Sequence, residues 1–303
     1  MPNEEIIQKI LKLKAERDAI ILAHNYQIGE VQDIADYTGD SLGLSLAASK
    51  VTAKVILFCG VRFMAETAAI ICPAKTVLVP DDNAGCPMAN MIKVRQLREL
   101  KKQHPKAKVV GYVNTTAAIK AECDICCTSA NAVKVVDSIP REFPIIFVPD
   151  QSLGDYASKQ CGREMILWGG YCPTHHRILA QDIINAKREH PKAEVMVHPE
   201  CTADVIELAD EAFSTSGMLR YAGETDAQEL IVGTEIGLLH SLRKKYPDKK
   251  FYPASELADC PNMKLNSLEK MLWSLEDMVY QVSVPEDIRI KAWSAIDKMM
   301  KLS

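Results

Sequence analysis

The sequence is poor in aromatic residues and has no apolar run long enough to cross a membrane. Aromatic side chains make up 6% of the 303 residues, which argues against the base-stacking surfaces of proteins that bind single-stranded nucleic acids. The net charge is −4 and no basic cluster is longer than residues 243–245, so a nucleic-acid partner is disfavoured. The glycine-rich patterns GxxxxGK[ST] and GxGxxG are missing, so nucleotide binding is not indicated either.

The first residues do not resemble a secretion signal. Residues 1–17 form a charged amphipathic stretch without an apolar core or a cleavage site. We therefore expect a cytoplasmic protein with no membrane partner. In that compartment the ten cysteines are better explained as thiols or metal ligands than as disulfides.

Three of the cysteines occur at nearly equal intervals, and a proline follows each of them. Cys86, Cys172 and Cys260 are separated by 86 and 88 residues. A His-Pro-Lys-Ala segment at residues 104–107 recurs at residues 190–193, again after 86 residues. We interpret the chain as three copies of one structural unit, each of which brings a cysteine to a common site.

Short β-branched runs alternate with helical segments along the whole chain, which indicates parallel sheets buried on both faces. The predicted strands include residues 55–58, 76–79, 109–112, 144–148, 195–197 and 230–232. The predicted helices include residues 31–37, 42–50, 64–71, 93–103, 152–160, 181–189 and 236–245. The sequence thus predicts an α/β fold of three pseudo-threefold-related, three-layer α/β/α units with parallel sheets around a central cavity. We expect the units to span residues 1–91, 92–178 and 179–303, the last with two closing helices.

Three thiolates that meet at one point favour a soft metal, and the spacing leaves its identity open. An iron–sulfur cluster on three cysteines keeps one iron without a protein ligand, so that this iron is a Lewis acid. A zinc ion on three cysteines has an open fourth position. A redox sensor without catalysis, or three buried thiols with only a packing role, are the remaining interpretations.

Polar residues gather where the predicted strands end, which is the edge where parallel sheets bind ligands. They are His24, Tyr26, Tyr112, Asn114, His198 and Glu200, with His175 close to Cys172. Such a set beside a metal supplies general acids and bases. Ser41, Ser129 and Ser214, the last followed by Thr215, precede predicted helices. We expect all three serines to cap helices, and their turns to bind anionic groups through free N–H groups.

Taken together, these motifs resemble the quinolinate synthase family in its short, three-cysteine form. The resemblance covers nearly the whole chain and rests on segments such as Ala23-His24-Asn25-Tyr26-Gln27, Cys86-Pro87-Met88-Ala89, Cys172-Pro173-Thr174-His175, His198-Pro199-Glu200-Cys201, Ser214-Thr215-Ser216-Gly217-Met218 and Cys260-Pro261-Asn262-Met263-Lys264. It implies a transferase of NAD biosynthesis that condenses iminoaspartate with dihydroxyacetone phosphate to quinolinate, phosphate and water. It also implies a [4Fe–4S] cluster on Cys86, Cys172 and Cys260, and aspartate oxidase or dehydrogenase as the source of iminoaspartate.

The resemblance also suggests roles for the polar residues. We expect Tyr26 and Glu200 to act as acid–base catalysts, Glu200 by removing a carbon-bound proton, with His24 and His198 beside them. The expected substrate-binding residues are His24, Ser41, Tyr112, Asn114, Ser129, His175, His198, Glu200, Ser214 and Thr215. The alternative function is an iron–sulfur hydro-lyase, or a three-cysteine zinc enzyme, that acts on another small dicarboxylate.

Overall fold

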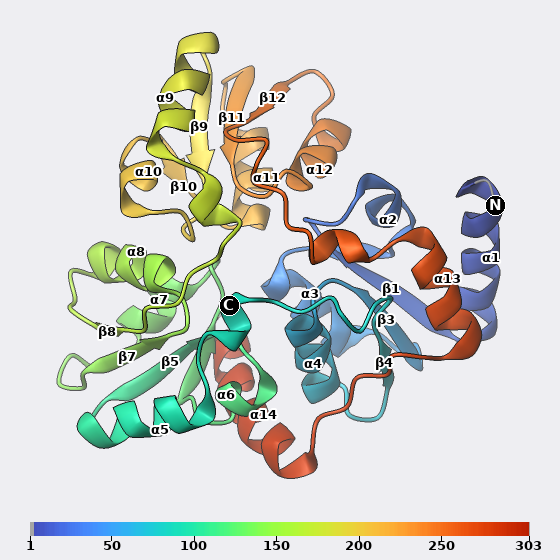
Figure 1. Cartoon of the computed structure of the whole chain (residues 1–303), viewed down its shortest axis with the longest axis horizontal. Helices are drawn as coiled ribbons and strands as arrows, with labels where there is room; N and C mark the ends of the chain where they lie inside the picture. The colour runs from blue at the N-terminus through green and yellow to red at the C-terminus, as the bar shows by residue number, and fades with distance from the viewer. Residues whose placement is uncertain (1–2, 303) are drawn as a thin grey trace.

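Three parallel sheets of four strands each form the framework of the protein. The computed structural model describes residues 3–302. The strand orders are β2-β1-β3-β4, β6-β5-β7-β8 and β10-β9-β11-β12, so the chain repeats one topology three times. Figure 1 shows the three units arranged around a common centre, the first in blue, the second in green and the third in yellow to orange. The predicted α/β fold is confirmed.

Each unit alternates strands and helices and ends in a short 3₁₀ turn. The first unit contains α1 Asn3–Glu16, β1 Ala19–His24, α2 Gly29–Ile34, β2 Tyr37–Gly39, α3 Ser41–Lys50, β3 Val55–Cys59, α4 Arg62–Ile71, β4 Thr76–Leu78 and η1 Met88–Asn90. The second contains α5 Val94–Gln103, β5 Lys108–Tyr112, α6 Ala117–Lys120, β6 Ile125–Cys127, α7 Ala132–Asp137, β7 Ile145–Val148, α8 Gln151–Cys161, β8 Ile166–Leu167 and η2 His175–Arg177. The third contains α9 Ala180–Glu189, β9 Glu194–Val197, α10 Ala203–Glu207, β10 Glu211–Ala212, α11 Thr215–Glu224, β11 Glu229–Gly233, α12 Leu238–Lys245, β12 Lys250–Pro253 and η3 Met263–Leu265.

Each of the three sheets contains the same side-chain-to-backbone hydrogen bond, which was not predicted from the sequence. In each unit an aspartate accepts the backbone N–H of a residue fifteen positions earlier, on the first strand of that unit. The aspartates are Asp36, Asp124 and Asp210, at 2.7 to 2.8 Å from the donor nitrogens. A buried strand N–H needs a partner, and these carboxylates supply one at the same place in all three units.

Alternate residues of the strands enter different parts of the core, which makes each unit a three-layer structure. In β1, Leu22 packs into the large central cluster, whereas its neighbour Ile21 packs into a second cluster with α1. All five residues of β3 are buried, as expected for a strand covered on both faces. The unbroken apolar run of this strand therefore reflects two-sided burial.

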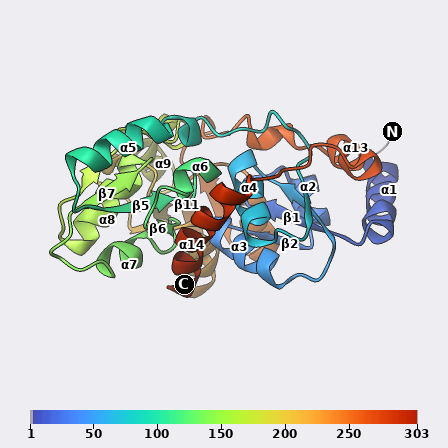
Figure 2. The same cartoon turned by 90° about the horizontal axis from the view of Figure 1, so that it is seen from below.

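Two helices complete the chain: α13 Leu268–Asp277 and α14 Glu286–Lys301. They pack away from the third unit. Helix α13 lies against α1, and α14 packs on α4, α6 and β6 (Figures 1 and 2). Between them, Val282 donates its N–H to Val77, so the connecting segment runs along edge strand β4. The C-terminal segment thus covers the first sheet and ties the first two units together.

One predicted helix is shorter than expected. The helix predicted for residues 31–37 ends at Ile34, and Tyr37 begins strand β2. The reason is tertiary: Tyr37 pairs with Leu22 of β1, and Asp36 accepts the N–H of Ile21. These strand contacts outweigh the local helical pattern. Among residues 3–302, no helix is long and apolar enough to cross a membrane.

Candidate functional site

The three units enclose a cavity of about 140 Å³ at their common centre. All three repeated cysteines line it. The predicted polar residues that also line it are His24, Tyr26, Ser41, Tyr112, Asn114, Ser129, His175, His198, Glu200 and Thr215. Ser214 is the exception, because its side chain lines a neighbouring cavity between α3, α7, α8 and α11. The topology explains this convergence, since the carboxyl ends of the first strands of all three sheets face the centre.

Cys86, Cys172 and Cys260 are partly buried and lie just before the turns η1, η2 and η3. Each sulfur accepts a hydrogen bond from the backbone N–H three residues further along, which belongs to Ala89, His175 or Met263. Burial raises the pKa of all three thiols, that of Cys86 to about 12. A cation would reverse this effect, because the thiolate is the metal ligand and the N–H groups stabilise its charge.

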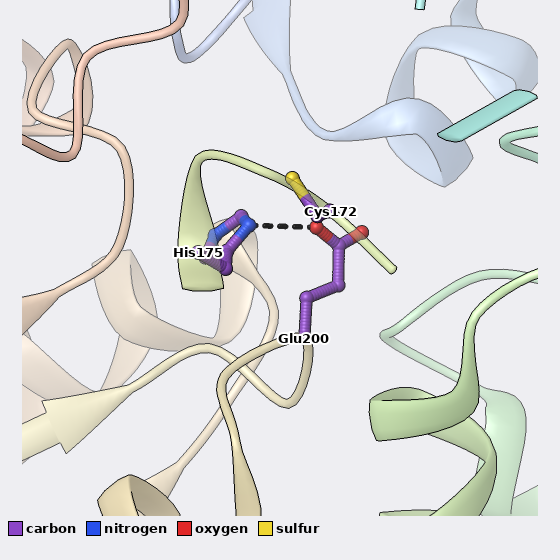
Figure 3. A group of neighbouring side chains, drawn as sticks. All are labelled: Cys172, His175 and Glu200. Atoms are coloured by element: carbon purple, nitrogen blue, oxygen red, sulfur yellow. Dashed lines mark ion pairs between the residues drawn. The ribbon is translucent and has the colours of Figure 1, made fainter. Parts of the chain in front are cut away.

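A second candidate metal site shares Cys172 with the three-cysteine site. Ligand atoms of Cys172, His175 and Glu200 lie within 4.8 Å of one another (Figure 3). In this group His175 Nδ1 is 2.7 Å from the Glu200 carboxylate, which is the contact marked by the dashed line. The imidazole and the carboxylate are therefore already in ion-pair contact, although the geometry leaves His175 Nδ1 without a hydrogen bond.

Glu200 is the most heavily contacted carboxylate of the cavity. Its second oxygen accepts hydrogen bonds from the Tyr112 hydroxyl and, at 3.2 Å, from the Asn114 amide. Burial alone would raise the pKa of Glu200, but His175, His198 and Tyr112 outweigh it and hold this pKa below its usual range. Glu200 is thus ionised at neutral pH although it is 3% exposed.

Tyr26 is linked to Glu200 through Thr234 and His175, and its hydroxyl also lies 3.4 Å from His175 Nε2 directly. Its hydroxyl lies 2.6 Å from the hydroxyl of Thr234, which in turn is 2.9 Å from His175 Nε2. The chain of contacts then runs Tyr26, Thr234, His175, Glu200 and Tyr112, with members from all three units. Burial raises the pKa of Tyr26 well above its usual value, so the phenol keeps its proton. The arrangement can pass protons between the two sides of the cavity.

The other two histidines are buried and uncharged. Burial lowers the pKa of His24 to about 4 and that of His198 to about 3. His24 packs edge-on against the ring of Tyr26, with 4.6 Å between the ring centroids. His198 stacks on His175, and its Nε2 is 3.1 Å from the Ser129 hydroxyl. As neutral rings, both can donate one hydrogen bond and accept another.

Only one of the three serine turns caps its helix as predicted. Ser214 accepts the N–H of Gly217 and caps α11, but Asp40 caps α3, and the cap residue of α7 is Asn131. The expectation was wrong for Ser41 and Ser129. An aspartate and an asparagine occupy the capping positions, so these two hydroxyls remain available: Ser41 is the first residue of α3, and Ser129 faces His198.

Four residues of the site were not singled out from the sequence. Asp40, Arg177 and Glu235 line the cavity, and Thr234 lies behind it in contact with Tyr26 and His175. Thr234 and Glu235 directly follow strand β11, whose central residues 230–232 were predicted. Thr234 and Glu235 come one and two residues after the end of β11, as His198 comes one residue after β9 and Asn114 two residues after β5. The same rule, that polar residues after a buried strand face the centre, would have identified them.

Comparison with known proteins identifies the family of the chain. The model of the family described as "Quinolinate synthetase A protein" matches residues 8–301. The chain is 56% identical over 302 residues to a quinolinate synthase of Dehalococcoides mccartyi strain CBDB1, with all of both chains covered. It is 53% identical over 300 residues to a quinolinate synthase of Methanosarcina barkeri, covering 99% of this chain and 98% of the relative. The chain belongs to the quinolinate synthase A family.

Proposed function

We propose that this protein is a quinolinate synthase, which condenses iminoaspartate with dihydroxyacetone phosphate to quinolinate, phosphate and water in NAD biosynthesis. The observation that carries the proposal is the convergence of three repeated cysteines on one cavity that also holds an ionised glutamate and a protonated tyrosine. The family membership supports the same activity. The overall reaction forms a ring and removes water and phosphate, so it requires several proton transfers at one site.

Cys86, Cys172 and Cys260 are the residues that would hold a [4Fe–4S] cluster. Their sulfurs do not lie within 4.8 Å of one another as a set. A single tetrahedral zinc ion, with Zn–S bonds of about 2.3 Å, would need them roughly 3.8 Å apart. A cluster would accept a wider set of sulfurs, because each thiolate binds a different iron. The backbone N–H groups directed at the sulfurs suit the same cofactor, because hydrogen bonds to sulfur tune such clusters.

The cluster would supply a Lewis-acidic iron without a protein ligand, which can polarise a hydroxyl or carboxylate of the substrate. The protein side chains then carry the protons. Glu200 is the base that removes a carbon-bound proton, because it stays ionised while buried. Tyr26 is protonated at neutral pH and is therefore the proton donor. Thr234 and His175 connect Tyr26 with Glu200.

The substrates bring two carboxylates and one phosphate, and the turns opposite the cysteines suit such groups. Ser41 and Thr215 begin helices α3 and α11, whose first N–H groups favour anions. Asn114, Ser129, His24 and His198 add neutral hydrogen-bonding groups. Neutral histidines orient an anion without forming a permanent ion pair, which helps product release. We also propose that an aspartate oxidase or dehydrogenase supplies the iminoaspartate.

The test is an anaerobic assay for quinolinate with the wild type, Glu200→Gln and Glu207→Gln. Glutamine keeps the size of Glu200 but cannot take up a proton, so we expect kcat to fall by about 10²- to 10⁴-fold. The second variant is the matched control, because the Glu207 side chain is 73% exposed on α10. Wild-type protein that carries iron and sulfide but forms no quinolinate would refute the proposed reaction. Full turnover by Glu200→Gln would show that the base is another residue.

A further inference from the structure

A buried ion pair at the rim of the cavity has no part in the proton transfers described above. The Glu235 carboxylate, whose side chain is fully buried, lies 2.8 Å from the ammonium group of Lys264. Glu235 follows strand β11 of the third unit, and Lys264 belongs to turn η3, four residues after Cys260. A charged pair in this position carries a desolvation cost that hydrogen bonds must offset. The hydrogen bonds of Glu235 and Lys264 therefore indicate which parts of the structure the pair stabilises.

Besides Lys264, Glu235 binds two backbone N–H groups, at Cys260 and just after β11. Its first oxygen accepts the N–H of Cys260 at 3.0 Å. Its second oxygen accepts the N–H of Gly237 at 2.7 Å. The carboxylate thus fixes the backbone of the third cysteine against the end of β11.

Lys264 connects the same group to the first unit. Its ammonium donates a hydrogen bond of 2.7 Å to the backbone carbonyl of Tyr26. Tyr26 is therefore held at both ends by neighbours from the third unit, at its carbonyl by Lys264 and at its hydroxyl by Thr234. The packing here is tight, since a Cβ on Gly237 would lie 2.8 Å from the Tyr26 carbonyl. A small movement of Lys264 would be transmitted to Tyr26.

We propose that Glu235 and Lys264 form a positioning pair. The pair holds the backbone of Cys260, the proposed ligand, and that of Tyr26, the proposed acid, in a fixed relative position across the boundary between the third and first units. Neither residue needs to touch the reacting atoms for this role. The inference rests on the proposed function in one respect, namely that Cys260 is a ligand and Tyr26 an acid. Removing Lys264 would leave a buried carboxylate without its cation beside a cavity for anionic substrates, which is more harmful than removing both charges.

The experiment compares Lys264→Met, Glu235→Gln and the double variant, with Lys270→Met as control. Lys270 pairs with Asp81 at 2.6 Å on the first unit, and neither of these residues lines the cavity. Two readouts are taken on anaerobically purified protein: the rate of iron loss to a chelator, and hydrogen exchange of the peptide that contains the Cys260 N–H. Should Lys264→Met fail to fold, Lys264→Gln with the same readouts decides.

We expect Lys264→Met to lose iron about tenfold faster or more, as is typical when a group that supports a metal ligand is removed. The peptide with Cys260 should exchange faster, and kcat should fall more than KM rises. The double variant should be less impaired than Lys264→Met, and Lys270→Met should match the wild type. Unchanged iron loss and exchange in Lys264→Met, or a double variant worse than both singles, would overturn the proposal. Wild-type protein without a cluster would refute the proposed cofactor instead, while the exchange data would still judge the pair.

Discussion

Thr234 contributes one hydroxyl to the contacts between Tyr26, the proposed acid, and His175, which pairs with the proposed base Glu200. It lies between the Tyr26 hydroxyl and His175 Nε2, at 2.6 and 2.9 Å. Thr234→Val keeps the shape of the side chain but leaves both neighbours without this partner. We expect a loss of about 1–3 kcal/mol in transition-state stabilisation, which is roughly a 5- to 150-fold fall in kcat/KM. Thr234→Ser, which retains the hydroxyl, should stay close to the wild type in the same anaerobic assay, and equal losses in both variants would contradict the relay.

His24 makes the stability of the protein depend on pH in one direction. Its pKa is lowered from 6.5 to about 4, chiefly by burial. Between these two pH values His24 stays neutral in the folded protein but takes up a proton in the unfolded chain. Stability is therefore complete above pH 6.5 and is lost as the pH falls towards 4, by up to about 3 kcal/mol. His198 acts in the same direction.

We expect His24→Asn to flatten the fall of the thermal unfolding midpoint between pH 6.5 and 4. His104→Asn serves as the control, because His104 follows α5 on the far side of the second unit from the cavity. The account of His24 is wrong if both variants follow the wild-type curve.

At the scale of single residues, the sequence predicted which residues line the cavity better than it predicted which side chains contact one another. The three cysteines and nine of the ten proposed substrate-binding residues line one cavity, because they lie in the segments that follow the carboxyl ends of the strands. Thr234 and Glu235 were missed, although they occupy equivalent positions after β11. What links Tyr26 to His175 is a contact between units, and such contacts leave no regular spacing in the sequence. The cap roles of Ser41 and Ser129 failed because Asp40 and Asn131 occupy those positions.

At the scale of the elements, α14 is a helix whose two faces differ sharply. Ile296 is fully buried in the central cluster, whereas Ile290 on the same helix is 56% exposed. Ile296→Ala removes buried methyl groups and leaves a cavity, so we expect a loss of about 2–5 kcal/mol in the free energy of unfolding. Ile290→Ala should change it by less than about 0.5 kcal/mol. Urea unfolding of the two variants side by side measures the difference, and equal losses would mean that α14 does not hold the first two units together.

Long amphipathic helices and buried strands were the elements that the sequence predicted well. Short edge strands were not, as β2 and β10 show. They have three and two residues, and they exist because a neighbouring strand offers free backbone groups. Such pairing depends on the assembled sheet, whereas the helical pattern of residues 31–37 is local. The closing helices were expected, but their packing on the first two units was not, since nothing in their sequence identifies the surface that they cover.

At the scale of the whole molecule, the threefold repeat is what makes the site. No single unit holds more than one of the three cysteines, and the proton-transfer chain also needs residues from all three. Unequal details within the repeat distinguish the three units: Glu200 of the third unit corresponds to Asn114 of the second and Tyr26 of the first, neither of which is a carboxylate. The symmetric parts therefore suit the proposed cofactor, and the asymmetric parts suit the proposed substrates.

The central claim is that Cys86, Cys172 and Cys260 together hold one iron–sulfur cluster in this cavity. The most direct test is iron, sulfide and zinc analysis of protein purified without oxygen, for the wild type and for each Cys→Ala variant. Cys126→Ala is the control, because Cys126 is buried in β6 and does not line the cavity. We predict about four irons and four sulfides per chain in the wild type and the control, and loss of the intact cluster in the other three variants. Stoichiometric zinc without iron in the wild type, or a full cluster in any of those three variants, would contradict the claim.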